Sequence, residues 1–367
     1  MRPTMPILLL LLLIQETSTP FTEQVTQNFE KWDRDSDGRI TAAELDALVE
    51  EPSITGKAAA ALAALKIVQR GDQWKYEPIT RVALAQYAAA RKKRQKPDGP
   101  PYDHYFDAAL KRISNAGLDL FRDPPPKLGS IRQGPLGDCY FIAPLGALLH
   151  RSPEAVRKMI QLHDDGTYCV TFGNRRTVRV AAPTETEFGM SSTAEKGSRW
   201  IAILEKAFAT FQNESLPDSR KKESETDLIA RGGPATQSIR VLTGRPGKYF
   251  ALRGKTDADK TPTEEDAIAK LPKVREILVS SVREKRLVFG NTPKAVSVPG
   301  ITPKHIFAVL SFDETTEKVG MWNPHGNKFT PKGEAGLQTG YETKDGNFAI
   351  PLEDFVKVFA GVSYEEP

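Results

Sequence analysis

The sequence predicts an α+β protein whose helices come first and whose strands gather toward the end of the chain. Apolar residues recur at helical spacing from Phe21 to Trp32, whereas alternating strand patterns dominate after His305. The 367 residues are enough for two or three domains with their own cores. Because helices and strands are segregated along the chain, we expect a helical part and a sheet-rich part with a cleft between them.

The first 20 residues predict a signal peptide. Arg2 precedes an apolar stretch, Pro6 to Ile14, which is too short to span a bilayer and is followed by small polar residues. We therefore expect a secreted or periplasmic protein that contacts a membrane only during export. An uncleaved anchor is the alternative interpretation of this segment.

Charge and cysteine content narrow the class of protein further. A formal net charge of +4 is too mild to indicate nucleic-acid binding, and the basic residues alternate with acids almost everywhere. The exception, Arg91 to Lys96, is followed by Pro and Gly, so residues 91–101 are interpreted as an exposed linker rather than a binding patch. Two cysteines cannot form a disulfide framework, and Cys169 lies in a strand pattern that indicates a structural role.

Residues 21–90 predict two helix–loop–helix motifs. A first helix has an apolar face, and a further helix is expected over 52–68. Ile40-Thr41 aligns with Ile79-Thr80, which reveals a weak internal repeat. The apolar face of the first helix is formed by Phe21, Val25, Phe29 and Trp32.

The first loop of this repeat predicts a Ca²⁺ site. Hard cations prefer several oxygen ligands held on one short turn, with a glycine at the sharp bend. Gly38 supplies the bend and Thr41 stands at position 9 of the loop. The expected ligands are the side chains of Asp33, Asp35, Asp37 and Glu44 and the backbone carbonyl of Arg39. The alternative, an Asp-rich turn without metal, is disfavoured because every position of the loop pattern is filled.

The second loop lacks the ligands. Asp72 occupies position 1, but Trp74, Tyr76 and Ala83 stand where further ligands are needed. We interpret 21–90 as an EF-hand pair whose second hand is degenerate and serves as a structural partner, with Ile40 in the short β-link between the hands.

From Pro101 onward the sequence predicts two further parts, residues 102–235 and 236–367. A mixed region with a helix near 264–285 lies between the two groups of strands. The expected helices are 105–116, the segment after Cys139, and 199–211, and the expected strands are 168–172, 176–182, 305–312, 318–323 and 347–355.

Cys139 stands at the start of an apolar helix, directly after a glycine-proline turn. Asp138 is a plausible N-cap, and Pro144 could kink the helix that follows. A helix N-terminus stabilises a thiolate through its dipole and free N–H groups, which favours a nucleophile. This segment alone leaves open the alternative of a buried structural cysteine.

His305 and Asn323 could supply the partners of a nucleophilic cysteine. The segment from His305 predicts a β-hairpin that turns near Glu314. In the expected register Phe307 faces Met321, Val309 faces Val319, and His305 faces Asn323. Side chains in direct opposition lie about 4.5–5.5 Å apart at Cβ, so the asparagine could orient the imidazole. His325, in the following turn, is a weaker candidate.

Several blocks in this order resemble the protease core of calpains, a family of papain-like cysteine endopeptidases regulated by calcium. The blocks are "QGPLGDCYF", "RWIAILEKAFATF", "HIFAV" and "WNPHGN", and the resemblance covers roughly residues 118–330.

The resemblance implies a two-subdomain papain-like fold, with a helical half and a β-rich half that close together near "ARGGP". It also implies Cys139 as nucleophile, His305 as general base and then acid, and Asn323 as the residue that orients the imidazole. Gln133 would donate to the oxyanion beside the Cys139 N–H, and losing such a donor costs about 10²–10³ in rate.

The chain departs from the family pattern in four places. Tyr140 replaces the usual tryptophan after the cysteine, and His325 replaces an aromatic residue that walls the cleft. Ser130 stands where family members commonly carry an aspartate of a core calcium site, so the N-terminal hand becomes the expected sensor. Animal calpains carry EF-hands after the core, whereas here the pair precedes it.

Taken together, the residues predict an exported, calpain-like cysteine endopeptidase that acts through a Cys thioester and is regulated or stabilised by Ca²⁺. We expect a monomer with protein or peptide substrates. One alternative is a catalytically weak scaffold that binds calcium and docks a protein partner, which the complete set of site residues disfavours. A transglutaminase is a further alternative, disfavoured because those enzymes typically have aspartate where this chain has Asn323.

Overall fold

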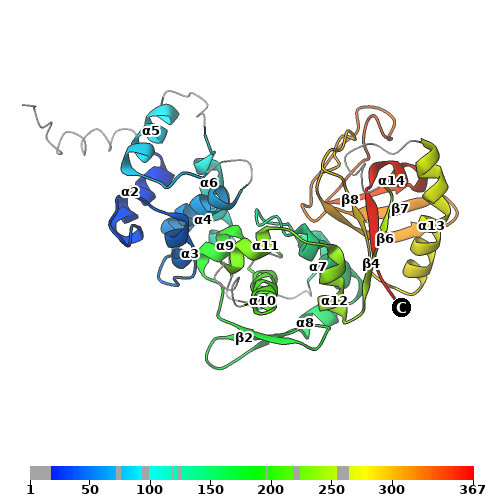
Figure 1. The fold of residues 1–367 in the computed structure, drawn as a ribbon, viewed down its shortest axis with the longest axis horizontal. Helices are drawn as coiled ribbons and strands as arrows, with labels where there is room; N and C mark the ends of the chain where they lie inside the picture. The colour runs from blue at the N-terminus through cyan, green and yellow to red at the C-terminus, as the bar shows by residue number, and fades with distance from the viewer. Residues whose placement is uncertain are drawn as a thin grey trace, which may run out of the picture. The chain divides into compact units, whose positions relative to one another are not determined.

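The computed structural model divides the chain into two compact units (Figure 1). The first comprises Met1–Gly117 with Pro183–Ser191, and the second comprises Leu118–Ala182 with Ser192–Pro367. The structure describes residues 18–71, 76–92, 99–117, 119–121, 126–195, 197–217, 224–253 and 264–367. Most of the predicted signal peptide, most of the basic linker, and Asp72 and Trp74 of the second loop therefore lie outside the described residues. No helix within the described ranges is long and apolar enough to cross a membrane.

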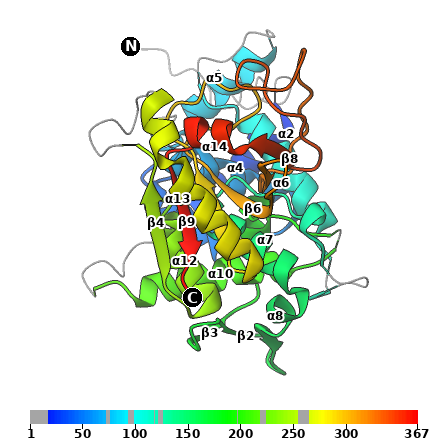
Figure 2. The same cartoon turned by 90° about the vertical axis from the view of Figure 1, so that its right-hand side faces the viewer.

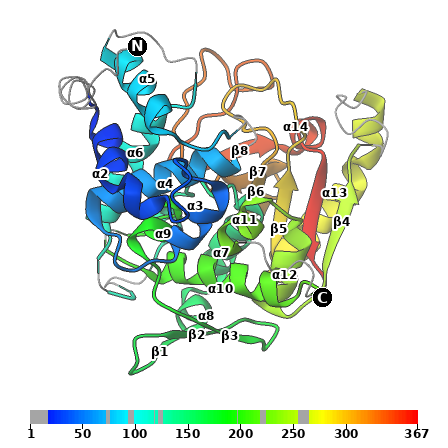
Figure 3. The ribbon, with the colours of Figure 1, turned by 60° about the vertical axis from the view of Figure 1, so that its left-hand side comes forward.

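The first unit is a bundle of helices in which α4 contacts α2, α3, α6 and α9 (Figure 3). The predicted apolar face of the first helix is confirmed, since its four apolar residues are buried. That helix begins at Pro20 because Thr19 caps it, and the side chain of Thr22 accepts a hydrogen bond from the Thr19 N–H in return. The helices are α2 (Pro20–Trp32), α3 (Ala42–Val49), α4 (Gly56–Arg70), α5 (Arg81–Lys92), α6 (Tyr102–Asn115) and α9 (Glu185–Met190).

Helices α6 and α9 join the first unit through small residues. A Cβ added to Gly189 of α9 would lie 3.0 Å from the Cβ of Ala63 and 3.2 Å from that of Ala109. Arg112 donates a hydrogen bond to the Gly189 carbonyl at 3.2 Å. The boundary predicted at residue 102 therefore falls after Gly117 instead, because α6 buries its apolar face against α4 and α9.

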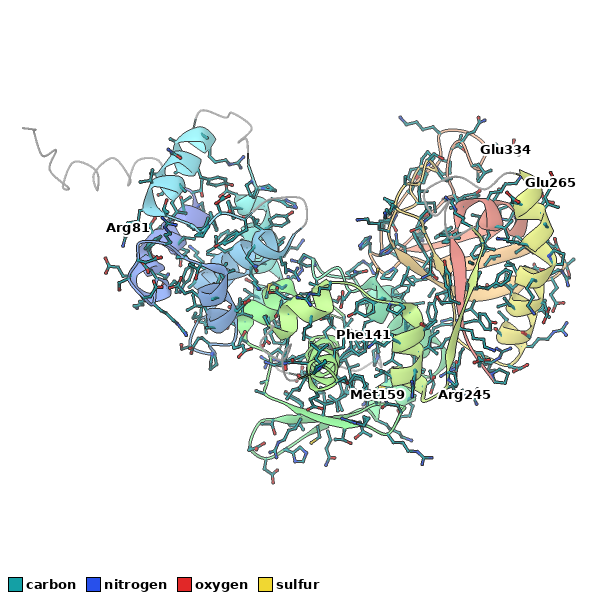
Figure 4. The ribbon with its side chains drawn as sticks, viewed as in Figure 1. Arg81, Phe141, Met159, Arg245, Glu265 and Glu334 are labelled. Atoms are coloured by element: carbon teal, nitrogen blue, oxygen red, sulfur yellow. The ribbon has the colours of Figure 1, made fainter. Side chains whose placement is uncertain are left out.

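The second unit begins with a helical half. Its three short strands form an antiparallel sheet in the order β1-β2-β3, with α10 packed against β2 and β3. Phe141 of α7, labelled in Figure 4, stacks on Phe208 of α10. Their ring centroids lie 4.2 Å apart. The elements are η1 (Leu128–Ser130), α7 (Cys139–Arg151), α8 (Pro153–Arg157), β1 (Ile160–Leu162), β2 (Tyr168–Thr171), β3 (Thr177–Val180), α10 (Trp200–Glu214), α11 (Glu225–Ala230) and α12 (Ala235–Thr243).

The rest of the second unit is a six-stranded antiparallel sheet in the order β4-β9-β5-β6-β7-β8. Two helices pack on it around a shared apolar core, and α13 lies across the strands (Figure 2). The elements are β4 (Gly247–Ala251), α13 (Glu264–Arg283), β5 (Val288–Asn291), β6 (Ile306–Asp313), β7 (Lys318–Trp322), β8 (Asn347–Pro351), α14 (Leu352–Val358) and β9 (Gly361–Glu365).

The sequence patterns did not reveal β4, β5 and β9. The edge strand β4 has no fully buried residue, so it lacks an alternating apolar signal. In β5 the first three of its four residues are buried, which removes the alternation as well. The strand predicted over 347–355 ends at Pro351, and α14 follows with Glu353 and Asp354 in its first turn, where carboxylates favour a helix start.

The β6–β7 hairpin differs in register from the predicted one. Val309 lies opposite Met321, whereas the sequence predicted Val319 at that position. A bulge between Val309 and Ser311 then changes the register closer to the turn. Such a bulge adds one residue to one strand, and no turn residue in the sequence marks it.

The register difference at the start of β6 is two residues, so the predicted faces of the side chains are unchanged. His305 and Asn323, which flank the two strands, therefore remain on the same face. Continuing the observed register beyond the strands brings His305 opposite His325, with Asn323 on the diagonal, within reach of a long side chain.

The two halves of the second unit meet where α7 packs on β6 and on the buried Trp322 at the end of β7. A Cβ added to Gly146 of α7 would lie 2.3 Å from Cζ3 and 2.7 Å from Cη2 of the Trp322 ring. Only a residue without a side chain permits this approach. Gly146 thus sets the distance between the helix that carries Cys139 and the strand that precedes Asn323.

We predict that Gly146→Ala destabilises the second unit. The added methyl group overpacks a rigid ring, which typically costs about 1–3 kcal/mol. Chemical denaturation followed by tryptophan fluorescence would measure the loss in free energy of unfolding. Gly129→Ala is the matched control, because a Cβ at Gly129 meets nothing within 4 Å. Equal stability of the two variants would contradict the proposed fit.

Candidate active site

Cys139 is the first residue of α7, and its position depends on a tight turn. Gly137 has φ +75°, a left-handed conformation that glycine adopts readily. Asp138 occupies the N-cap position, but its side chain makes no capping hydrogen bond, contrary to the sequence prediction. The helix continues through Pro144 to Arg151 with a buried apolar face.

The Cys139 thiol is held between α7 and the start of β6. Its sulfur is hydrogen-bonded to the backbone of Ile306, the residue directly after His305, and to the backbone of Tyr140. The pKa of the thiol is raised to about 11, chiefly by burial and also by the charge on Asp138, while backbone contacts oppose the rise. The neutral thiol is therefore favoured in the resting site.

His305 and Asn323 form the pair that the sequence predicted. The Nε2 atom of His305 lies 2.9 Å from Oδ1 of Asn323, and both residues are buried. Asn323 Oδ1 also accepts the backbone N–H of His325 at 3.0 Å. Because a carbonyl oxygen can only accept, we assign the imidazole proton to Nε2, which leaves Nδ1 with a lone pair for proton transfer.

His325 lies directly on the His305 ring. Their ring centroids are 4.3 Å apart with an interplanar angle of 17°. The pKa of His305 is lowered to about 3, chiefly by burial and also by the positive form of His325, while the bond to Asn323 opposes both effects. Burial also lowers the pKa of His325. The residue treated as the weaker candidate in the sequence is thus the stacking partner of His305.

Gln133 is tied to the same site through the backbone. Its N–H donates to the Pro324 carbonyl at 2.8 Å, which links the segment before α7 to the turn after Asn323. Its Oε1 atom is buried without a hydrogen-bond partner among the described residues. The site thus gathers Cys139, His305, Asn323 and Gln133, although the part of the chain that the structure describes contains no direct thiol–imidazole hydrogen bond.

The predicted calcium loop of the first unit gathers acidic oxygens. Atoms of Asp33, Asp35 and Asp37 all lie within 4.8 Å of one another. Asp33 accepts the N–H groups of Asp37 at 3.0 Å and Gly38 at 2.9 Å, and Gly38 has φ +83°. The Arg39 N–H donates to Asp37 at 2.8 Å. Three hard oxygen donors held on one turn fit a hard cation.

Glu44 stands at the end of this loop and caps α3. Its carboxylate accepts the N–H of Arg34 at 2.6 Å and that of Thr41 at 2.8 Å. Burial raises the pKa of Glu44, but these hydrogen bonds outweigh it and hold the pKa below its usual value. The carboxylate is therefore ionised at neutral pH, the form in which it can bind a cation.

The two loops of the repeat are joined by a short β-bridge. Ile40 and Ile79 exchange both backbone hydrogen bonds, with N–O distances of 2.8 and 3.1 Å. The Tyr76 hydroxyl donates to the Ile40 carbonyl at 2.9 Å. Tyr76, which stands in a ligand position of the second loop, thus links the two loops by a hydrogen bond.

A cysteine at a helix N-terminus, beside a histidine–asparagine pair on an antiparallel sheet, is the arrangement of a cysteine peptidase. Comparison with known families agrees with this class. The family model described as calpain family cysteine protease matches residues 127–364. This match covers more than half of the chain, which therefore belongs to the calpain family and contains a cysteine protease domain.

We predict that the stability of the second unit falls on acidification below about pH 6.5, the usual pKa of histidine. His305 is 5% exposed and its neutral form is favoured, so the unfolded chain binds more protons at lower pH. Such a histidine contributes up to about 1.4 kcal/mol per pH unit to the slope. His305→Phe keeps a ring at this position but cannot titrate, and it should reduce the slope between pH 6.5 and 5.

Denaturation curves at several pH values would measure this slope. His150→Phe is the matched control, since it removes an exposed imidazole from the same unit. A slope in His305→Phe as steep as that of the unaltered chain would contradict the burial of His305 in neutral form.

Proposed function

We propose that this chain is an exported endopeptidase that hydrolyses peptide bonds through a thioester on Cys139 and is regulated or stabilised by Ca²⁺. The observation that carries the proposal is the 2.9 Å contact between His305 Nε2 and Asn323 Oδ1, which leaves Nδ1 as a base. The backbone contact from Ile306 to the sulfur supports the same assignment, because it holds the thiol next to His305.

In the proposed mechanism the Cys139 thiol passes its proton to His305 Nδ1. Burial opposes a charge on either group alone, whereas transfer within the pair creates two opposite charges that stabilise each other. The sulfur attacks the scissile carbonyl carbon, and the imidazolium then gives its proton to the leaving amine. Water, deprotonated by His305, hydrolyses the thioester.

Stabilisation of the oxyanion is assigned to Gln133 and the Cys139 N–H. The Cys139 N–H is one of the free donors at the start of α7. The hydrogen bond from Gln133 N–H to Pro324 supports this role, since it fixes the donor segment relative to the His305–Asn323 pair. Two donors aimed at the developing charge contribute most in a water-poor site.

For Ca²⁺ we assign the side chains of Asp33, Asp35, Asp37 and Glu44 and the carbonyl of Arg39 as ligands. A bound ion would neutralise the mutual repulsion of carboxylates that lie within 4.8 Å of one another. The Ile40–Ile79 bridge supports an EF-hand pair, because it joins the two loops as the internal repeat predicts. Export is supported by the apolar stretch from Pro6 to Ile14.

The first test is casein hydrolysis under reducing conditions by the chain without residues 1–17, titrated with calcium. We expect cleavage that rises with calcium and is abolished in Cys139→Ala, because the variant lacks the attacking sulfur. Unchanged proteolysis in the variant would contradict the assignment of the nucleophile.

The calcium dependence separates the finer alternatives. Cleavage without any response to calcium would make the N-terminal unit a structural or docking module. No cleavage at any calcium concentration would favour the scaffold, in which the protease fold presents a surface to a partner and catalyses nothing.

We predict separately that Glu44→Gln weakens Ca²⁺ binding severely, because an amide lacks the charge and the two equivalent oxygens of a carboxylate. Glutamine still completes a capping box, so α3 should remain folded. Titration calorimetry would measure the affinity. Glu51→Gln is the matched control, since Glu51 is a surface partner of Arg34 outside the loop. Equal Ca²⁺ binding isotherms for the two variants would show that Glu44 is not a ligand of the ion.

A further inference from the structure

Two buried carboxyl groups contact each other directly behind the proposed nucleophile. The carboxyl groups of Asp138 and Glu205 interact with each other, and the residues are 0% and 3% exposed. Two negative charges on interacting carboxyl groups in a buried site repel strongly, which favours one proton on the pair. The proposed reaction does not use this proton, so the acid pair must have a role other than proton transfer to the substrate.

Burial and the charge of Asp138 both raise the pKa of Glu205 well above its usual value. The neutral, protonated form of Glu205 is therefore favoured. The titratable groups on which Asp138 acts from the start of α7 are Cys139 and Tyr140. The Tyr140 hydroxyl donates to Gln212, on the same helix as Glu205, at 3.1 Å.

Glu205 holds both ends of the short segment that precedes α7. At one end, its two oxygens accept the Ser192 N–H at 3.0 and 3.1 Å, and Ser192 Oγ accepts the Gly134 N–H at 3.1 Å. At the other end, the carboxyl group of Glu205 interacts with that of Asp138.

This segment carries the groups assigned to the oxyanion. Gln133 directly precedes Gly134, and Cys139 directly follows Asp138. The Asp138 carbonyl accepts the N–H groups of Phe141 at 2.8 Å and Ile142 at 3.0 Å, so the second end is also fixed to α7. Any movement of Glu205 would therefore displace both donors.

We propose that Glu205 is a positioning residue whose protonated carboxyl donates to Asp138 and fixes residues 134–138, so that Gln133 and the Cys139 N–H converge on the oxyanion. This inference rests on the proposed function, which it extends to a residue on α10. Removal of the proton at high pH would leave two carboxylates in contact, and their repulsion would loosen the segment.

Three variants test the proposal. Glu205→Gln keeps a neutral donor and an acceptor of the same shape, whereas Glu205→Ala removes both. Glu214→Gln is the matched control, because it makes the same change at an exposed residue of α10 that pairs with Arg176. We expect Glu205→Gln and Glu214→Gln to keep the kcat of the unaltered chain. Glu205→Ala should approach the about 10²–10³-fold loss that accompanies a missing oxyanion donor.

Two measurements do not depend on proteolysis and are made on the inactive Cys139→Ala chain. The infrared C=O stretch of a protonated carboxylic acid should be present at neutral pH and lost in Glu205→Gln. Exchange of the Gly134 amide hydrogen should be slow in that chain and in its Glu205→Gln form, and fast in the Glu205→Ala form.

Each outcome bears on the proposal. An absent carboxylic acid band, or a Glu205→Gln chain as impaired as Glu205→Ala, would overturn it. Protected Gly134 exchange in Glu205→Ala would overturn the positioning role even if the proton is present. If the unaltered chain cleaves no substrate, the proposed function fails, whereas the infrared band and the amide exchange still decide the role of Glu205.

Discussion

The packing of α7 on β6 and Trp322 is the contact on which the whole site depends. Trp322 fits against the helix because Gly146 has no side chain, and the same packing brings Ile306 to the Cys139 sulfur. Cys139 and His305 come from segments far apart in the sequence, so local structure cannot bring them together. The geometry of the site is consequently coupled to the stability of the second unit.

Burial determines the charges that this site can carry. It opposes a charge on the thiol and on the imidazole separately, and it allows one negative charge at most on the adjoining acid pair. Hydrogen bonds then decide where protons reside: Asn323 holds one on His305 Nε2. In the arrangement that we propose, Glu205 donates another to Asp138.

Much of the site could be predicted because its signals are local. The turn before Cys139 and the apolar run after it identify the helix start, and the hairpin places His305 and Asn323 on one face. The predicted register differs from the observed one by three residues next to the turn, and the bulge between Val309 and Ser311 reduces the difference to two residues toward His305. A shift of two residues preserves the faces, so the pair was predicted correctly from an incorrect alignment.

The sequence by itself determined most of the helices, the hairpin, the acidic loop from Asp33 and the candidate site residues, because these depend on spacing within short segments. Only the tertiary structure decided that His325 stacks on His305 and that Asp138 bonds Glu205 instead of capping α7. It also decided that α6 packs with the first unit. These outcomes depend on which segments, distant in the sequence, pack together in the folded chain. Packing and desolvation across the whole fold decide which partner each side chain meets.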